Sequence, residues 1–183
     1  RLCHVLSNSR FLGDALNKSV ESVTWLGSDN DLQPRSRESL DVQTHASLER
    51  NVGSINDFAN SIRAMRRHEI ERIGLGWMSG VIDDKASLAG MTDVYDTAID
   101  ASLTWAIRHQ TQEMGLDEAP AAIAVIGMGR YGGREVNFSS DADVIIIYRP
   151  SDNADDNQAN LFARKVQEDL RAILQGPTTV SYT

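Results

Sequence analysis

The short distance between two apolar runs is the feature that most constrains the fold of this chain. Residues 121–127 (AAIAVIG) and 142–148 (ADVIIIY) have the length and composition of buried strands. Three glycines with the spacing G-x-G-x-x-G lie at the end of the first run and just after it, at Gly127, Gly129 and Gly132. In a dinucleotide-binding fold this pattern opens a whole helix, and an acidic residue that binds the ribose follows about 20 residues later. Residues 134–140 leave no room for that helix, so the sequence argues against a dehydrogenase.

Two aspartates at the second apolar run predict a metal site. Asp141 and Asp143 are two positions apart, and in a strand such residues point to the same face, about 7 Å from each other. The residues between and after them would point toward the core: Ala142, Val144 and Ile146. Two neighbouring carboxylates repel each other, and a hard divalent cation such as Mg²⁺ between them removes the repulsion.

The glycine turn beside this pair predicts a phosphate ligand. Gly132 and Gly133 would leave backbone N–H groups free for phosphate oxygens. Either motif alone is more often a plain structural turn. Together, in a strand, turn and strand arrangement, they indicate a nucleotide that is held through a metal ion.

The chain has helical periodicity from its start to about residue 118. Ser54 begins a capping-box-like sequence, and apolar residues then recur at helical spacing to about Ile73, where glycines follow. A second long helix is expected after Thr92, with its end at Gly115. We therefore predict an all-helical region over residues 1–118.

After residue 118 the period changes to that of strands. The second apolar run closes at Pro150, and a helix is expected from about Asn157 to Leu174. The final residues, 178–183 (TTVSYT), predict the start of a third strand. Residues 119–183 are thus a second domain, and the predicted fold class is α+β.

Composition narrows the class of partner and the compartment. The net charge is −8, with no basic patch in the sequence that would hold a nucleic acid. No segment has the roughly 20 apolar residues that cross a bilayer, and no signal peptide is evident. A single cysteine, Cys3, excludes an internal disulfide, and we expect a cytoplasmic protein.

The histidines lack metal-ligand spacing: His4, His45, His68 and His109. One basic run predicts a solvated helix face or a dock for an acidic partner: Arg63, Arg66 and Arg67.

The segment over residues 127–144 (GMGRYGGREVNFSSDADV) resembles the signature of the glutamine synthetase adenylyltransferase family. That signature is approximately G-x-G-x-x-G-G-x-E followed by S-D-x-D. The matching residues are Gly127, Gly129, Gly132, Gly133, Glu135, Ser140, Asp141 and Asp143. Upstream stretches such as MRRHEIERIG are similar to the helical region of the same family. The resemblance implies a nucleotidyltransferase domain of the polymerase-β type with a small mixed sheet, incomplete at its C-terminus.

The resemblance also implies a reaction. It would be the Mg²⁺-dependent transfer of AMP from ATP to a tyrosine of glutamine synthetase, a step in the regulation of nitrogen assimilation. Asp141 and Asp143 would bind the metal and carry the catalysis. Five residues would contact the nucleotide: Gly127, Gly129, Gly132, Gly133 and Ser140. Glutamine synthetase is the expected partner, together with a PII-type signalling protein, and a third carboxylate is expected within a few positions beyond Thr183.

Two alternatives on the same fold stay open. Members of the family have a transferring half and an adenylyl-removing half that share the motif, and the stretches RLCHVLSNS and RRHE favour the transferring half. A non-catalytic regulatory module would bind glutamine synthetase or a PII-type protein and would tolerate the loss of Asp143.

Overall fold

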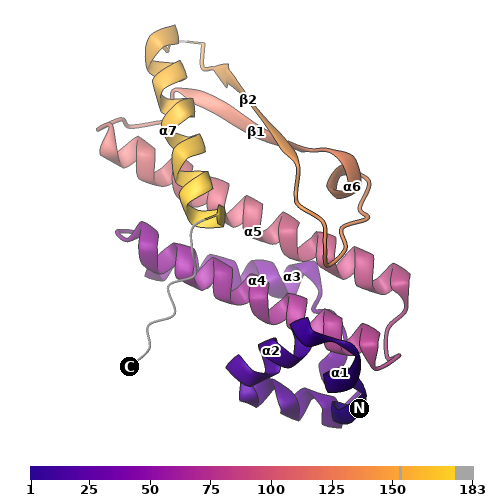
Figure 1. The fold of residues 1–183 in the computed structure, drawn as a ribbon. Helices are drawn as coiled ribbons and strands as arrows, with labels where there is room; N and C mark the ends of the chain where they lie inside the picture. Colours follow the sequence, from indigo (N-terminus) through magenta and orange to yellow (C-terminus); the bar gives the residue numbers. More distant parts are fainter. Residues whose placement is uncertain (153, 176–183) are drawn as a thin grey trace.

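Helices make up most of the molecule (Figure 1). The structure is a computed structural model and describes residues 1–152 and 154–175. The helical region consists of α1 (Leu2–Asn8), α2 (Arg10–Lys18), the 3₁₀ segments η1 (Val20–Gly27) and η2 (Asn30–Leu32), α3 (Arg37–Arg50), α4 (Ile55–Met78) and α5 (Asp84–Glu113). It is followed by β1 (Ala121–Gly127), α6 (Gly129–Gly132), β2 (Val144–Pro150) and α7 (Asp156–Gln175). No helix in the described part of the chain has both the length and the apolar character needed to span a membrane.

Helix α4 begins where the sequence predicts but ends later. The Ser54 side chain accepts a hydrogen bond from the backbone N–H of Asp57 at 3.2 Å, which caps the first turn. The predicted end near Ile73 is wrong, because α4 continues to Met78 through its glycines. At Gly76 the carbonyl of Leu32 occupies the place where a side chain would start. The glycine therefore allows close contact between α4 and η2 and does not end the helix.

Helix α5 begins earlier than predicted. Its N-cap is Asp83, whose carboxylate accepts the N–H of Ala86 at 2.7 Å. Thr92 lies inside the helix, where its hydroxyl donates to the Leu88 carbonyl at 2.8 Å. The predicted end is confirmed: α5 stops at Glu113, and Gly115 adopts a φ of +64° that favours glycine.

The two strands form an antiparallel sheet, from the pair Ala121–Pro150 at one end to Gly127–Val144 at the other. The helix-facing side includes Val125, Val144 and Ile146, as the alternation predicts, but the opposite face is not buried. Its large side chains are about half exposed: Ile126, Ile145 and Ile147. The α+β class is confirmed, whereas the sheet is antiparallel over the described residues. The predicted third strand, residues 178–183, lies outside them.

One continuous core joins the helical region to the segment after residue 118. Phe58 of α4 stacks on Trp105 of α5, with ring centroids 5.6 Å apart. The same cluster contains Tyr131 from α6 and Ile173 from α7. In Figure 1, α7 crosses α5, and the sheet lies alongside both helices. The residues of the glycine turn are therefore held by contacts with the helical region.

Two arginines of α4 hold the end of α7, contrary to the predicted solvated face. Arg63 donates to the carbonyls of Ile173, at 2.8 Å, and Ala172. Arg66 donates to the Leu174 carbonyl at 3.2 Å. The last carbonyls of a helix lack partners within the helix and attract cations. Only Arg67 is exposed as the sequence predicts.

Candidate active site

The glycine turn begins where β1 ends. Gly129 has a φ of +52°, a left-handed conformation that strains any residue with a side chain. Gly132 packs directly against the carbonyl of Gly127, so a side chain at Gly132 would collide with the strand. Each glycine therefore has a steric reason that does not depend on a ligand.

The last two glycines of this turn use their backbone N–H groups in hydrogen bonds within the turn. The N–H of Gly132 donates to the Met128 carbonyl at 2.9 Å, and that of Gly133 donates to the Gly129 carbonyl at 3.0 Å. The N–H groups of Gly132 and Gly133 thus have internal partners in this conformation, unlike the free donors that the sequence suggested. Gly129, which is exposed, is the glycine nearest to the acidic pair.

The structure brings Asp143 next to the glycine turn. The Met128 N–H donates to the Asp143 carbonyl at 2.8 Å, which extends the strand ladder past the end of β1 and ahead of the start of β2. A β-carbon built on Gly129 would lie 3.9 Å from Oδ2 of Asp143. Asp141 and Asp143 precede β2, so the predicted strand starts later than expected. Their exposure still alternates with that of Ala142 as the strand pattern requires.

Neither carboxylate has a partner among the described residues. Asp141 and Asp143 are both exposed, and no hydrogen bond or ion pair joins their side chains to the rest of the described chain. Two neighbouring, unpaired carboxylates are hard oxygen donors of the kind that Mg²⁺ prefers. The donor set therefore fits Mg²⁺. No third acidic, histidine or cysteine side chain completes a metal cluster within the described residues.

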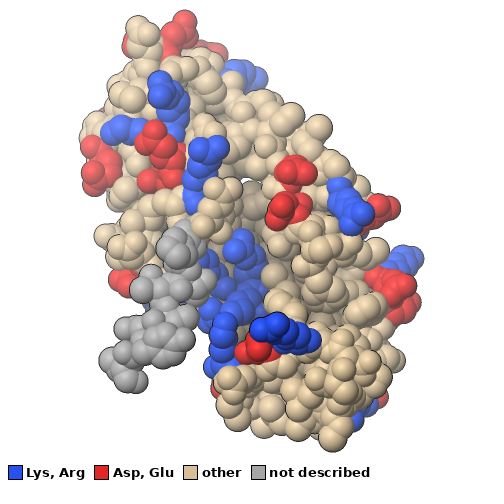
Figure 2. Space-filling model, in the orientation of Figure 1, with Lys and Arg blue, Asp and Glu red and all other residues tan. Residues whose placement is uncertain are grey.

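A cavity of about 730 Å³ adjoins the pair, a volume typical of small-molecule sites. Asp141 and Asp143 line it from one side, while Arg66 of α4 and Arg171 of α7 line it from the helices. Its remaining wall is partly apolar and includes Tyr95, whose ring lies 5.9 Å from the Arg66 guanidinium. Figure 2 shows this face hollowed between α4 and the sheet, with basic side chains gathered over α4. The cavity thus carries both signs of charge.

Ser140 has a local structural role in this conformation. Its hydroxyl donates to the side-chain oxygen of Asn137 at 2.9 Å and accepts the Asn137 N–H at 3.2 Å. The same oxygen of Asn137 also accepts two hydrogen bonds from Ser139. These contacts shape the turn that leads into Asp141.

Comparison with known proteins identifies the family of the chain. The family model for glutamate-ammonia ligase adenylyltransferase matches residues 1–182, nearly the whole chain. The chain belongs to this family.

Several relatives in this adenylyltransferase family are named bifunctional glutamine synthetase adenylyltransferase/adenylyl-removing enzymes. One from Bifidobacterium longum (strain DJO10A) is 74% identical over 98% of this chain. Those from Leifsonia xyli subsp. xyli and Mycobacterium marinum are 39% and 34% identical, over 82% and 97% of it. The chain spans only 17%, 14% and 18% of the length of these three relatives.

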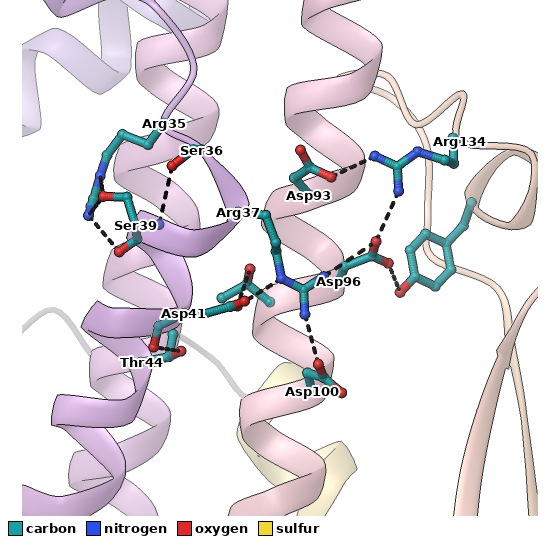
Figure 3. Close-up of polar contacts among 12 residues, drawn as sticks. Arg35, Ser36, Arg37, Ser39, Asp41, Thr44, Asp93, Asp96, Asp100 and Arg134 are labelled. Atoms are coloured by element: carbon teal, nitrogen blue, oxygen red, sulfur yellow. Dashed lines mark hydrogen bonds and ion pairs between the residues drawn. The ribbon is translucent and has the colours of Figure 1, made fainter.

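Sequence reasoning missed one group of charged residues beside the signature of the adenylyltransferase family (Figure 3). Three aspartates of α5 form ion pairs with Arg37 of α3 and with Arg134, which follows the glycine turn: Asp93, Asp96 and Asp100. Their spacing places them on one side of the helix. That acidic stripe was visible in the sequence, but its partners lie about 40 to 60 residues away along the chain.

Proposed function

We propose that this chain contributes the nucleotide site of an enzyme that transfers AMP from ATP to a tyrosine of glutamine synthetase. The observation that carries the proposal is the unpaired Asp141 and Asp143 beside Gly129, at the edge of a cavity with basic residues on its other side. The names of the relatives supply the protein substrate. Mg²⁺, the tyrosine acceptor, a PII-type partner and a cytoplasmic location are further parts of the proposal.

The residues of the chain suit such a reaction in distinct ways. Asp141 and Asp143 would hold Mg²⁺, which when bound neutralises phosphate charge and activates the attacking hydroxyl. Gly129 has no side chain beside Asp143, where a β-carbon would come within 3.9 Å of the carboxylate. Arg66 and Arg171 place positive charge across the cavity, where it attracts a polyphosphate. Because Gly132 and Gly133 donate internally, we infer that the phosphates approach the turn from the side of Gly129.

The experiment follows label from ATP to protein. The protein, in the full length that its gene encodes, is incubated with α-labelled ATP, Mg²⁺ and glutamine synthetase, next to its Asp143→Asn variant. Label on a tyrosine with the wild type alone supports the proposal. Equal labelling by both proteins would show that AMP transfer does not depend on Asp143, and unchanged binding of glutamine synthetase without labelling by either would favour a regulatory module.

The removing reaction is the second candidate, because the relatives carry both activities in their names. Its test uses glutamine synthetase that already carries AMP, with inorganic phosphate in place of ATP. Release of ADP by the wild type, lost in Asp143→Asn, would assign this chain to the removing half. The two assays together separate the halves, which share the same motif.

A further inference from the structure

Asp96 of α5 contacts the glycine turn at two points (Figure 3). Its Oδ1 accepts the hydroxyl of Tyr131 at 2.7 Å, and its Oδ2 lies 3.3 Å from a guanidinium nitrogen of Arg134. Tyr131 stands between Gly129 and Gly132, and Arg134 directly follows Gly133. One carboxylate of the helical region thus contacts both the middle of the turn and the residue that follows it.

The conformation of Arg134 indicates that these contacts constrain the turn. Arg134 has a φ of +59°, the left-handed region that glycine usually occupies. Such strain persists only where surrounding contacts hold the residue in place. Arg134 has those contacts, because its guanidinium also pairs with Asp93 at 2.6 Å.

Tyr131 transmits the contact to the motif itself. Its side chain is buried, and its ring lies so close to Gly127 that a β-carbon there would be 3.0 Å away. Burial, followed by the hydrogen bond to Asp96, raises the pKa of the Tyr131 hydroxyl. The phenol therefore remains a donor to the Asp96 carboxylate at any physiological pH.

Arg37 links Asp96 to a second helix. Its guanidinium lies 3.5 Å from Asp96, hydrogen-bonds Asp41 of α3 at 2.7 Å, and contacts Asp100 at the same distance. Asp96 is thus fixed from α3 while it holds the glycine turn from α5. Asp100 shares Arg37 but has no contact with the turn in the described structure.

We propose that Asp96 is a positioning residue for the nucleotide site, which fixes the glycine turn relative to Asp143 from outside the signature motif. The contribution to nucleotide binding rests on the proposed function. The contribution to the conformation of the turn stands on the contacts alone. Since the turn would contact ATP equally in the ground state and the transition state, its loosening raises KM more than it lowers kcat.

The test compares Asp96→Asn with Asp100→Asn in the full-length protein. Both variants remove one charge from the same helix face and one partner of Arg37, but only the first touches the turn. Hydrogen exchange over residues 127–135 should quicken about tenfold or more in Asp96→Asn and stay within about twofold in Asp100→Asn. The KM for ATP should rise about tenfold in Asp96→Asn with kcat within about threefold.

A second variant controls for misfolding. Arg134→Gly keeps the positive φ without strain and removes the partly exposed side chain that pairs with Asp93 and Asp96. It should quicken exchange in the same segment while the melting temperature stays close to that of the wild type. Identical behaviour of Asp96→Asn and Asp100→Asn, or unchanged exchange in Asp96→Asn and Arg134→Gly, would overturn the proposal. A wild type that neither binds nor uses ATP would refute the proposed function and leave the exchange comparison valid.

Discussion

Two groups of aspartates in this molecule differ in whether their carboxylates have arginine partners. On α5, Asp93, Asp96 and Asp100 all pair with arginines, and the partners come from α3 and from the residue after the glycine turn. Before β2, Asp141 and Asp143 stand two positions apart without a partner in the described chain. The first group joins parts of the fold. The second group is left available to something outside it.

Under the proposed function, this difference distinguishes carboxylates that stabilise the fold from carboxylates that bind a ligand. Like charges held close together disfavour the folded state, and ion pairs at the surface recover little free energy. A protein under selection for stability alone would pair or replace Asp141 and Asp143, as it pairs the aspartates of α5. Their unpaired state is what the proposed Mg²⁺ site requires.

The largest expected effect is on activity, at the unpaired group. Asp141→Asn should lower AMP transfer about a thousandfold, because a metal ion that holds the phosphate lowers the activation barrier by several kcal/mol. The same change should leave the free energy of unfolding within about 0.5 kcal/mol, since it breaks no contact. Transfer of label from α-labelled ATP and urea unfolding measure the two effects.

Mg²⁺ itself supplies the control for that prediction. The melting temperature of the wild type should rise with added Mg²⁺, because a ligand that binds only the folded state stabilises it. The rise should vanish in Asp141→Asn and persist in Asp100→Asn. If Mg²⁺ does not raise the melting temperature of the wild type, the proposal that Asp141 and Asp143 bind a cation is contradicted.

The second largest expected effect is a loss of stability when the paired aspartates of α5 lose an arginine partner. Arg37→Ala leaves three carboxylates without their shared cation: Asp41, Asp96 and Asp100. Arg37 is about one third exposed and its three partners range from partly to mostly exposed, so the free energy of unfolding should fall by only about 1–2 kcal/mol. The matched control is Arg10→Ala, whose pair with Asp14 at 3.9 Å is largely exposed. Arg10→Ala should lower the free energy of unfolding by less than about 0.5 kcal/mol. Equal losses for the two variants in urea unfolding would show that the Arg37 ion pairs do not stabilise the fold.

A buried carboxyl group on α4 should make the stability of the protein depend on pH. Glu71 of α4 is 1% exposed, and neither of its side-chain oxygens has a hydrogen-bond partner within the described structure. Burial raises the pKa of its carboxyl, an effect that the neighbouring Ser22 and His68 only partly oppose. A raised folded pKa gives stability that is complete below the ordinary glutamate pKa of about 4.3 and is lost as pH rises through the folded value.

Glu71→Gln isolates this effect. The stability of the variant relative to the wild type should increase as pH rises from about 4.3 through the raised pKa of Glu71, because glutamine carries no charge to bury. Urea unfolding at several pH values in that window measures the difference. A difference that does not change with pH would show that Glu71 titrates alike in the folded and unfolded states.

The smallest effect is that of salt. Raising the ionic strength should weaken the ion pairs between the aspartates of α5 and their arginine partners. The total loss in the free energy of unfolding should be less than about 1 kcal/mol, because the pairs are partly exposed and salt screens them. The urea midpoint of the wild type should therefore fall slightly more than that of Arg37→Ala. A larger loss in the variant would contradict the assignment of these pairs as the salt-sensitive ones.

The sequence predicted local features of the fold well. The cap at Ser54, the end of α5 near Gly115 and the inward direction of Ala142 follow from neighbouring residues, and the structure has all three. The closeness of the glycine turn to Asp143 was also predictable, because few residues separate the two strands. Pattern and spacing are sufficient where the determinants are close together in the chain.

The failures share a physical cause. Gly76 continues α4 because of a contact with Leu32, and Arg66 is not solvated because it holds the end of α7, about 108 residues away. The role of Asp96 depends on Arg37 and on the glycine turn, which no local pattern connects. Contacts distant in sequence override local propensity at such positions. The metal ligands and the nucleotide contacts stay predictions, since neither the comparisons nor the contacts test them.

The contacts between Arg63 and the end of α7 have a consequence for the order of folding. They join residues 110 positions apart, whereas α4 and α5 are neighbours in the chain. Contacts of long sequence separation form slowly, because a large loop must close first. During synthesis the N-terminal part folds first. We therefore expect α3 to α5 to fold first and α7 to dock on them afterwards, so that the cavity beside Asp141 forms only once α7 has docked.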